Sequence, residues 1–204
     1  MQENLMIKKP ENKQHHGNLK EALVLAGMQI LEEEGLAALT LRRCAAMAGV
    51  SHAAPAHHFD GLKGLRTAIA IRGYAIFEQM MKDGIAAAGT EPRAQALGMC
   101  IGYVRFATKH NALFNLIFDR PDMFIQNDDW KRSGGSARQV LNDISALFED
   151  GPGGPSATEV ALFALVHGYS KLIEIGRVVP GSDDGRDVSF EDVMDFMELQ
   201  VKQN

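Results

Sequence analysis

The sequence lacks the features that define secreted, membrane-spanning and disulfide-rich proteins. Its 204 residues include only two cysteines, Cys44 and Cys100, which are too few and too far apart for a disulfide framework or a Cys-x-x-Cys metal site. No apolar run reaches the ~20 residues that a transmembrane helix needs. Residues 1–17 are polar and contain no apolar signal-peptide core. We therefore expect a cytoplasmic protein without a membrane partner.

Motifs of catalysis and of metal binding are missing as well. There is no Gly-rich phosphate loop, no Gly-x-Ser-x-Gly motif and no pair of carboxylates at a useful spacing. His52, His57 and His58 do not have the i, i+4 spacing that brings two imidazoles from one helix face onto one metal ion. We therefore expect a protein that is not an enzyme and that holds no metal ion and no cofactor.

The charges are distributed unevenly along the chain. The net charge of −5 by itself argues against binding to nucleic acid. Residues 1–66, however, carry eight basic and seven acidic side chains and five of the seven histidines, whereas the remainder carries 13 basic and 19 acidic side chains. A basic surface on an acidic body is typical of a DNA-binding domain joined to another function. Because the basic excess is small, tight binding is expected to need two copies.

Residues 40–65 predict two short helices joined by a tight turn. The hydroxyl of Thr40 can accept a backbone N–H at the start of the first helix, and apolar residues follow at helical spacing. Gly49 suits the left-handed residue that ends a helix, and Ser51 can cap the next helix, 52–59. This is the helix-turn-helix pattern, in which the second helix lies in the major groove of DNA. An ordinary helical hairpin has the same spacing, so the pattern alone leaves both interpretations open.

Helical spacing of apolar residues predicts further helices on both sides of this motif. The first begins at Asn18, which can cap it, and ends with three glutamates at 32–34 that are expected to face solvent. Asp60 is expected to cap the helix that follows the motif. The predicted helices after the motif span 60–82, 93–109, 111–118, 130–149, 156–176 and 189–203.

Two of these helices begin with a capping-box pattern, Ser156 with Glu159 and Ser189 with Asp192. The helix at 156–176 is apolar nearly all round, so it must be covered on several sides. In a chain of this size, we expect one of those sides to face a second subunit. No strand pattern is found, and the sequence predicts an all-α fold of about nine helices.

The stretch from residue 32 to residue 70 resembles the DNA-binding domain of TetR/AcrR-type bacterial transcription regulators. The matching features are the end of the first helix, Gly35, Thr40, the AGVS turn at 48–51, the pair His58 and Phe59, and Leu65. From Pro92 onward the chain resembles the subgroup whose C-terminal domain has a Trp-His-Gly signature. His167 and Gly168 match that signature, with Phe163 where the aromatic residue, usually Trp, is expected.

The sequence departs from the family pattern in the predicted DNA-binding element. Ala56 stands where the family has a phosphate-binding Tyr, and Leu62 stands where it has Lys, with Lys63 one position later. Ala53 replaces a small Gly early in the recognition helix. These changes remove one or two phosphate contacts. They keep open the alternative of an all-α ligand-binding or protein-interaction module without specific DNA binding.

The resemblance implies the organisation and the function of the whole chain. Residues 18–66 would be a three-helix DNA-binding domain with the helix-turn-helix, and 67–204 an effector-binding and dimerisation domain, while the polar composition of 1–17 predicts a disordered leader. A homodimer would pair its last two helices, 156–176 and 189–203, into a four-helix interface and read a palindromic double-stranded DNA operator. A small apolar or amphipathic effector would move the helix at 60–82 and release the DNA. A repressor is the family default, and an activator remains open.

The resemblance also implies two sets of site residues. The expected DNA-binding residues are Thr40, Arg43, Ser51, His52, Ala53, Ala54, His57, His58 and Lys63. Among them, His52, Ala53, Ala54 and His57 would face base edges, and Thr40, Arg43, His58 and Lys63 would hold phosphates. The expected ligand-binding residues are Met99, Tyr103, Phe106, Phe118, Trp130, Phe163 and His167. Most of these are equally explained as core residues, and His167 is also explained by a bond to a backbone carbonyl.

Overall fold

The computed structural model describes residues 19–119, 122–151 and 153–202. Over these residues the chain forms eight α-helices, two short 3-10 helices and no strands, which confirms the all-α prediction and is close to the nine helices expected. The predicted leader at 1–17 and the predicted cap Asn18 lie outside the described residues. The elements are α1 Leu19–Glu34, η1 Leu36–Ala38, α2 Leu41–Met47, η2 Ala54–His57, α3 Gly61–Ala87, α4 Pro92–Lys109, α5 Asn111–Asp119, α6 Asp128–Ser145, α7 Pro155–Glu174 and α8 Phe190–Met194.

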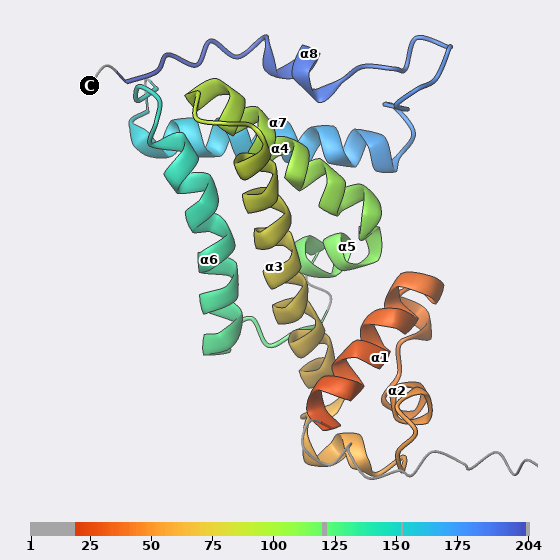
Figure 1. Ribbon diagram of the computed structural model, residues 1–204. Helices are drawn as coiled ribbons and strands as arrows, with labels where there is room; N and C mark the ends of the chain where they lie inside the picture. The colour runs from red at the N-terminus through yellow and green to blue at the C-terminus, as the bar shows by residue number, and fades with distance from the viewer. Residues whose placement is uncertain (1–18, 120–121, 152, 203–204) are drawn as a thin grey trace, which may run out of the picture.

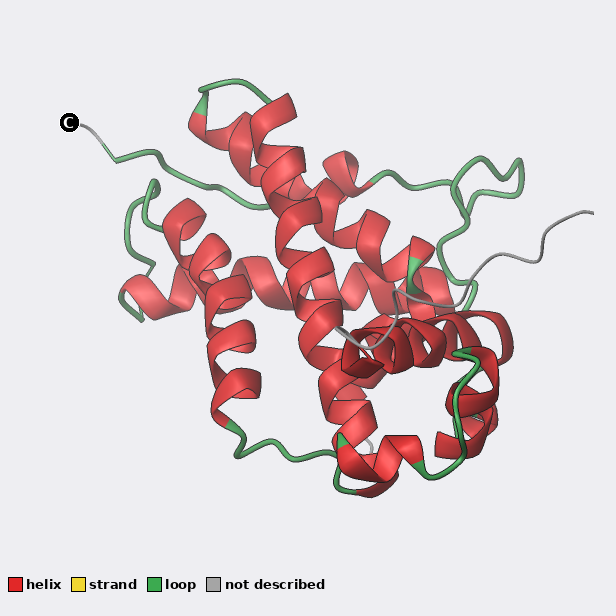
Figure 2. Ribbon diagram, turned by 60° about the horizontal axis from the view of Figure 1, so that its bottom comes forward, coloured by secondary structure: helices red, strands yellow, loops and turns green. Residues whose placement is uncertain are grey.

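The elements form an N-terminal head and a larger helical body (Figure 1). The head consists of α1, α2 and η2, and it lies at the start of α3. The long helix α3 then runs into the body, where it packs against α4 and α6. Helices α7 and α8 lie at the end of the body away from the head, and Figure 2 shows the same arrangement with the head turned forward. One helix therefore belongs to both parts of the molecule.

A continuous apolar core joins the head to the body. In the head it includes Leu23 and Cys44, and in the body it includes Phe106 and Phe114, all with no exposed surface. Leu65, near the start of α3, is buried between the two parts of this core. Helix α3 buries apolar surface against both the head and the body, so the hydrophobic effect holds it to both.

Helix α3 is longer than the predicted 60–82, because it continues to Ala87. The prediction ended it near a Gly- and Ala-rich stretch, but glycines allow α3 and α4 to touch there. A Cβ atom on Gly84 would lie 2.0 Å from the carbonyl oxygen of Gly98, and one on Gly102 would lie 2.2 Å from the carbonyl oxygen of Met80. The predicted side-chain cap is also wrong, since Asp60 makes no capping hydrogen bond.

The C-terminal part of the chain differs most from the prediction. The last helix ends at Met194 rather than near residue 203, although its capping box between Ser189 and Asp192 is present. Residues 195–197 form turns, and the chain then pairs with the segment after α6: the amide of Glu149 donates to the carbonyl of Gln200 at 2.7 Å. This pairing with the end of the chain also explains why α6 ends at Ser145 rather than at residue 149. A four-helix interface that uses 189–203 as a helix is therefore wrong.

Candidate functional site

The turn of the predicted helix-turn-helix is formed as its residues require. The hydroxyl of Thr40 accepts the backbone N–H of Arg43 at 3.2 Å, which confirms the predicted cap of α2. Gly49 has a φ of +69°, the left-handed conformation that favours glycine. These two local features turn the chain from α2 toward the next element.

The second element of the motif is shorter than predicted. It is the 3-10 helix η2, not an α-helix over 52–59, and its cap is Ala53 rather than Ser51. Pro55 has no N–H and cannot donate to the carbonyl of Ser51, which accepts the amide of Ala54 at 3.0 Å instead. The carbonyl of Ser51 is thus bonded by the residue three positions later rather than four, which is the hydrogen-bond pattern of a 3-10 helix.

Two buried residues anchor this element to the head. Pro55 is buried and Phe59 is 7% exposed, so both belong to the core side of the turn. The residues predicted to face bases or phosphates point the other way: Ser51, His52, Ala53, His57 and His58 are exposed, and Ala54 is partly exposed. We call the exposed segment 51–58 the head tip.

Arg43 and Lys63, two cations near the head tip, are paired within the molecule. Arg43, expected to hold a phosphate, forms an ion pair with Glu34 at the end of α1. This hydrogen bond raises the pKa of Arg43 and lowers the pKa of Glu34. Lys63 lies 3.7 Å from Asp122 and over the ring of Phe124. The cations are therefore held in defined positions.

The glutamates at 32–34 are exposed, as expected, and two of them also make polar contacts within the molecule. Besides the pair of Glu34 with Arg43, Glu32 lies 3.3 Å from Nδ1 of His110, which follows α4. Burial raises the pKa of Glu32 despite this neighbour. The end of α1 thus makes polar contacts to both α2 and the body.

The body contains a cavity of about 300 Å³ between α3, α4, α5, α6 and α7. The expected ligand-binding residues Tyr103, Phe118 and Phe163 line it. Met99 and Phe106 lie in the core with no exposed surface, and Trp130 packs edge-on against Tyr74 with ring centroids 5.0 Å apart. Sequence reasoning missed the other lining side chains, which are Tyr74, Phe77 and Met81 on α3, Ala137, Arg138 and Leu141 on α6, and Glu159 on α7.

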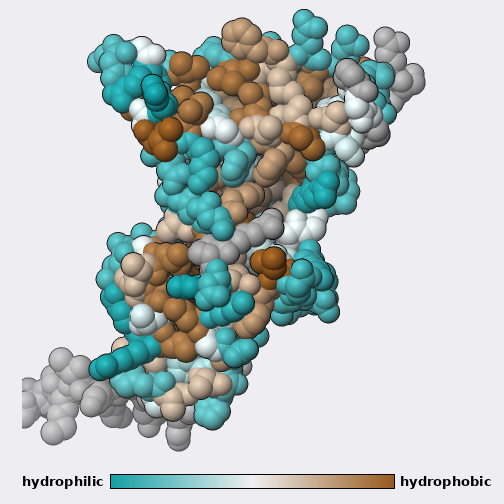
Figure 3. Space-filling view, turned by 180° about the vertical axis from the view of Figure 1, so that it is seen from behind, coloured by the Kyte–Doolittle hydropathy of each residue, from teal (hydrophilic) through white to brown (hydrophobic). Residues whose placement is uncertain are grey.

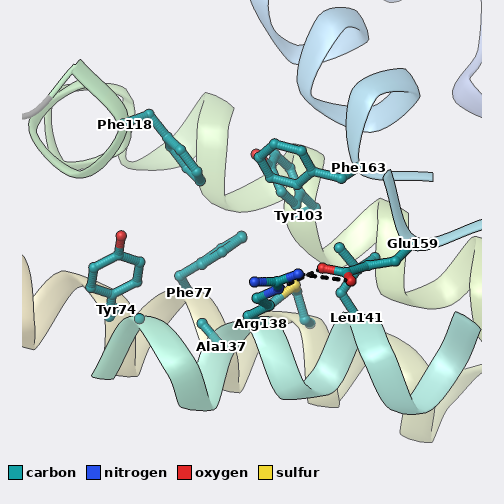
Figure 4. A pocket seen from close by; sticks show the side chains of 11 residues that line it. Tyr74, Phe77, Tyr103, Phe118, Ala137, Arg138, Leu141, Glu159 and Phe163 are labelled. Atoms are coloured by element: carbon teal, nitrogen blue, oxygen red, sulfur yellow. Dashed lines mark hydrogen bonds and ion pairs between the residues drawn. The ribbon is translucent and has the colours of Figure 1, made fainter. Parts of the chain in front are cut away.

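An ion pair between two helices forms part of the cavity wall (Figure 4). Nε and Nη2 of Arg138 donate to the two carboxylate oxygens of Glu159 at 2.7 and 3.0 Å. The Arg138 side chain is 65% exposed, whereas the Glu159 side chain is only 12% exposed. The predicted capping box of Ser156 and Glu159 is wrong, because α7 begins with Pro155 after Gly154, which places Ser156 inside the helix, and it has no side-chain cap.

The expected ligand-binding residue His167 lies behind the cavity wall. Its Nδ1 is 2.8 Å from the hydroxyl of Tyr103, so its polar partner is a side chain and not a backbone carbonyl. Its ring also stacks on Phe163 at 5.4 Å. Burial, and then the nearby charge of Lys171, lower the pKa of His167, while burial raises the pKa of Tyr103. A neutral imidazole can accept the hydrogen of the Tyr103 hydroxyl.

Residues 96–197 match the family described as "Tetracyclin repressor-like, C-terminal domain". The chain belongs to the TetR family of transcription regulators. Helix-turn-helix DNA binding and response to a ligand are typical of this family. The match does not test the Trp-His-Gly subgroup, which stays a prediction.

Solved structures resemble this TetR-family chain over most of its length. A protein of unknown function from Rhodococcus sp. RHA1 is 28% identical with a TM-score of 0.73, and the match covers 91% of this chain and 94% of that one. A TetR family transcription regulator from Marinobacter aquaeolei VT8 is 18% identical with a TM-score of 0.58, covering 90% and 96%. A TetR-like transcriptional regulator, also from Rhodococcus sp. RHA1, is 16% identical with a TM-score of 0.56, covering 87% and 90%. No curated protein matches the sequence.

The surface of this TetR-family protein carries apolar side chains at the end of the body away from the head. The space-filling view from behind shows apolar side chains at this end, and others on the head (Figure 3). Val160, Leu172 and Ile175 on or next to α7, and Phe196 beyond α8, are 59%, 42%, 68% and 92% exposed. Within the described residues, no helix is long and apolar enough to cross a membrane, and no group of three His, Cys, Asp or Glu side chains is placed to hold a metal ion.

Proposed function

We propose that this transcription regulator is a repressor that binds a palindromic operator as a homodimer and releases it when a small molecule enters the body cavity. The observation that carries this proposal is that one helix serves both sites. α3 begins two residues after Phe59, the anchor of the head tip, and its residues Tyr74, Phe77 and Met81 line the cavity.

The exposed head tip supports the DNA-binding part. His52 and His57 can hydrogen-bond purine acceptors in the major groove, and Ala53 and Ala54 can contact thymine methyl groups. The element that would enter the groove is only the four residues Ala54–His57, so few base pairs per half-site would be read directly. Thr40, Arg43, His58 and Lys63 would hold phosphates on either side, and Ser51 lies at the start of the tip.

The rigidity of α3 supports the release step. A ligand that enlarges the cavity pushes on Tyr74 and Phe77, and a continuous helix transmits that displacement to the head. The head of each subunit then changes its distance from the other head. This is coupling between two sites through a rigid-body movement.

The exposed apolar residues at α7 support the dimer. Leu172 and Ile175 leave apolar side chains in water that a second copy would cover, and Phe196, beyond α8, is 92% exposed as well. The interface therefore centres on α7, and the extended C-terminal segment replaces the long last helix that the sequence predicted. A two-fold axis through this interface presents the two head tips to successive major grooves.

A sequence-selection experiment with immobilised protein and random duplex DNA tests the DNA-binding part. We expect enrichment of two inverted half-sites whose centres lie about one helical turn, ~10 base pairs, apart. The double variant His52→Ala/His57→Ala serves as the control and should enrich no sequence. A ligand-binding module without DNA recognition would enrich nothing even as the native chain, and would fail to shift random genomic DNA at low salt.

A further inference from the structure

The two partners of the Arg138–Glu159 ion pair differ greatly in their access to water. The guanidinium side chain of Arg138 is 65% exposed, but the carboxylate side chain of Glu159 is 12% exposed. When the side-chain amide of Asn142 is oriented with its nitrogen toward Glu159, this nitrogen lies 3.2 Å from Oε1 and 2.9 Å from Oε2 of the carboxylate and donates to both. The carboxylate is thus a built feature of the cavity wall, whereas the guanidinium reaches it from the surface (Figure 4).

This asymmetry determines which charge a ligand can carry into the cavity. An anionic ligand that took Arg138 away from Glu159 would leave a largely buried carboxylate without a cation, which is strongly unfavourable, and one that contacted Arg138 without breaking the pair would lie next to that carboxylate. A cationic ligand can take the place of Arg138, whose guanidinium returns to water at little cost because it is already mostly exposed. Exchange of one cation for another keeps Glu159 paired throughout.

The rest of the cavity wall selects the body of such a ligand. Phe77, Tyr103, Phe118 and Phe163 provide aromatic rings, and Phe77 and Tyr103 meet edge-on with centroids 4.8 Å apart. Aromatic faces attract both flat apolar groups and cations. A cavity of about 300 Å³ is at the small end of ligand sites, so it suits one fused ring system with a short chain.

We propose that the ligand of this cavity is a small amphipathic aromatic cation whose positive group displaces Arg138 from Glu159. This inference rests on the proposed effector role of the cavity and adds the chemical class of the effector. Displacement also breaks the tie between α6 and α7, and α6 packs directly on α3. Loss of the ion pair is therefore the first step by which ligand entry reaches the helix that holds the head.

Three probes with one skeleton and different charges test this proposal. They are 3-(1-naphthyl)propan-1-amine, 3-(1-naphthyl)propan-1-ol and 3-(1-naphthyl)propanoate, titrated into the full-length protein at pH 7 by calorimetry. We expect the amine to bind about tenfold more tightly than the alcohol, and the carboxylate to bind more weakly than both. An alcohol or carboxylate that binds as tightly as the amine overturns the proposal.

Variants of the ion pair separate charge recognition from general effects on the fold. Glu159→Gln should bring the amine to the affinity of the alcohol, while the affinity for the alcohol changes less than about twofold, because the cavity shape is kept. Arg138→Gln should strengthen amine binding by about threefold or more, because the internal competitor is removed. Arg132→Gln, which removes a similar exposed ion pair with Asp129 elsewhere on α6, is the matched control and should change nothing.

Calorimetry and DNA release give independent answers. An amine that binds selectively but leaves operator affinity unchanged supports the ligand class and contradicts the effector role. An alcohol or carboxylate that both binds preferentially and releases DNA supports the effector role and contradicts the ligand class. If Glu159→Gln melts at a lower temperature than the native chain, the Arg138→Gln variant still tests the proposal. A decrease in the affinity of Arg138→Gln for the amine would contradict it.

Discussion

The hydroxyl of Tyr103 on α4 lies 2.8 Å from Nδ1 of His167 on α7, and this bond ties the cavity wall to the proposed dimer helix. Tyr103 is 3% exposed, so its hydroxyl needs a partner inside the protein. The imidazole accepts the hydroxyl hydrogen only while its Nδ1 carries no proton. Protonation of His167 at low pH therefore removes the acceptor of this hydrogen bond.

We expect His167 to make the protein less stable in mild acid. Burial lowers the pKa of His167, so the unfolded chain takes up this proton first as the pH falls below the ordinary value of about 6.5. Stability from this group is complete above about pH 6.5 and is lost as the pH falls through the lowered pKa. Between pH 7.5 and pH 5, the melting temperature of the native chain should fall a few degrees more than that of His167→Gln.

The exposed His52 provides the control for this measurement. His52→Gln should follow the pH profile of the native chain, because its side chain stands in water at the head tip. A His167→Gln profile that runs parallel to the native one would show that the Tyr103 bond does not depend on protonation.

The contact between α3 and α4 should not tolerate a methyl group. In Gly84→Ala the new Cβ would lie 2.0 Å from the carbonyl oxygen of Gly98, so the two backbones must separate. We expect a loss of about 1–3 kcal/mol in the free energy of unfolding, measured by urea denaturation. Gly135→Ala on α6, where a Cβ meets no atom within 4 Å, should instead gain about 0.5–1 kcal/mol. Equal stabilities for the two variants would mean that the helices do not touch at Gly84.

Arg43 is expected to contribute a phosphate contact that is independent of DNA sequence. Arg43→Ala should weaken binding to all duplexes about equally and reduce the salt dependence of log K by about 0.9, the value for one phosphate. Gel-shift titrations at several salt concentrations measure both effects. Arg42→Ala, on the exposed face of the same helix, is the control and should leave the slope unchanged. An unaltered slope for Arg43→Ala rules out its phosphate role.

His52 is expected to read bases rather than phosphates. His52→Ala should therefore reduce the affinity for the selected operator by about tenfold, which is the lower end of the loss expected for one specific base contact. The affinity for random DNA should change little. His58→Ala, which removes a proposed phosphate ligand, should weaken both kinds of DNA alike. Competition gel shifts with operator and random duplexes distinguish the two patterns, and equal losses for His52→Ala would place His52 outside the readout.

The dimer should depend on Ile175. Replacing this 68% exposed residue by Glu places a charge in the proposed apolar interface, so Ile175→Glu should elute as a monomer in light-scattering chromatography and retain its helical circular dichroism. Leu25→Glu, at a 49% exposed position on α1, is the matched control and should remain a dimer. If both variants stay dimeric, the interface lies elsewhere.

The two capping-box patterns illustrate how far sequence reasoning reaches. Ser189 and Asp192 form the predicted reciprocal bonds, with the amide of Asp192 3.1 Å from the Ser189 hydroxyl. Ser156 and Glu159 have an equivalent pattern, but the Glu159 carboxylate binds Arg138 from another helix. Pro155, directly before Ser156, moves the start of α7 ahead of that serine, whereas the partner that Glu159 finds is 21 positions away in the chain.

The cavity could be predicted only in part for a similar reason. The family resemblance implied Tyr103 and Phe163 as cavity residues, and both line the cavity. It implied Met99 and Phe106 as well, but these two side chains are fully buried in the core and do not line the cavity. Whether an apolar side chain fills the core or borders a void depends on the volume of its neighbours on other helices.

The amino-acid sequence by itself determined the all-α fold, the cap at Thr40 and the left-handed turn at Gly49, since helical spacing, caps and turns are satisfied within a few residues. Only the tertiary structure decided that α3 reaches Ala87, that the last helix stops at Met194, and that Glu159 meets Arg138 at the cavity. These outcomes depend on surfaces brought together from distant parts of the chain, where close packing and the pairing of buried charge outweigh local preference.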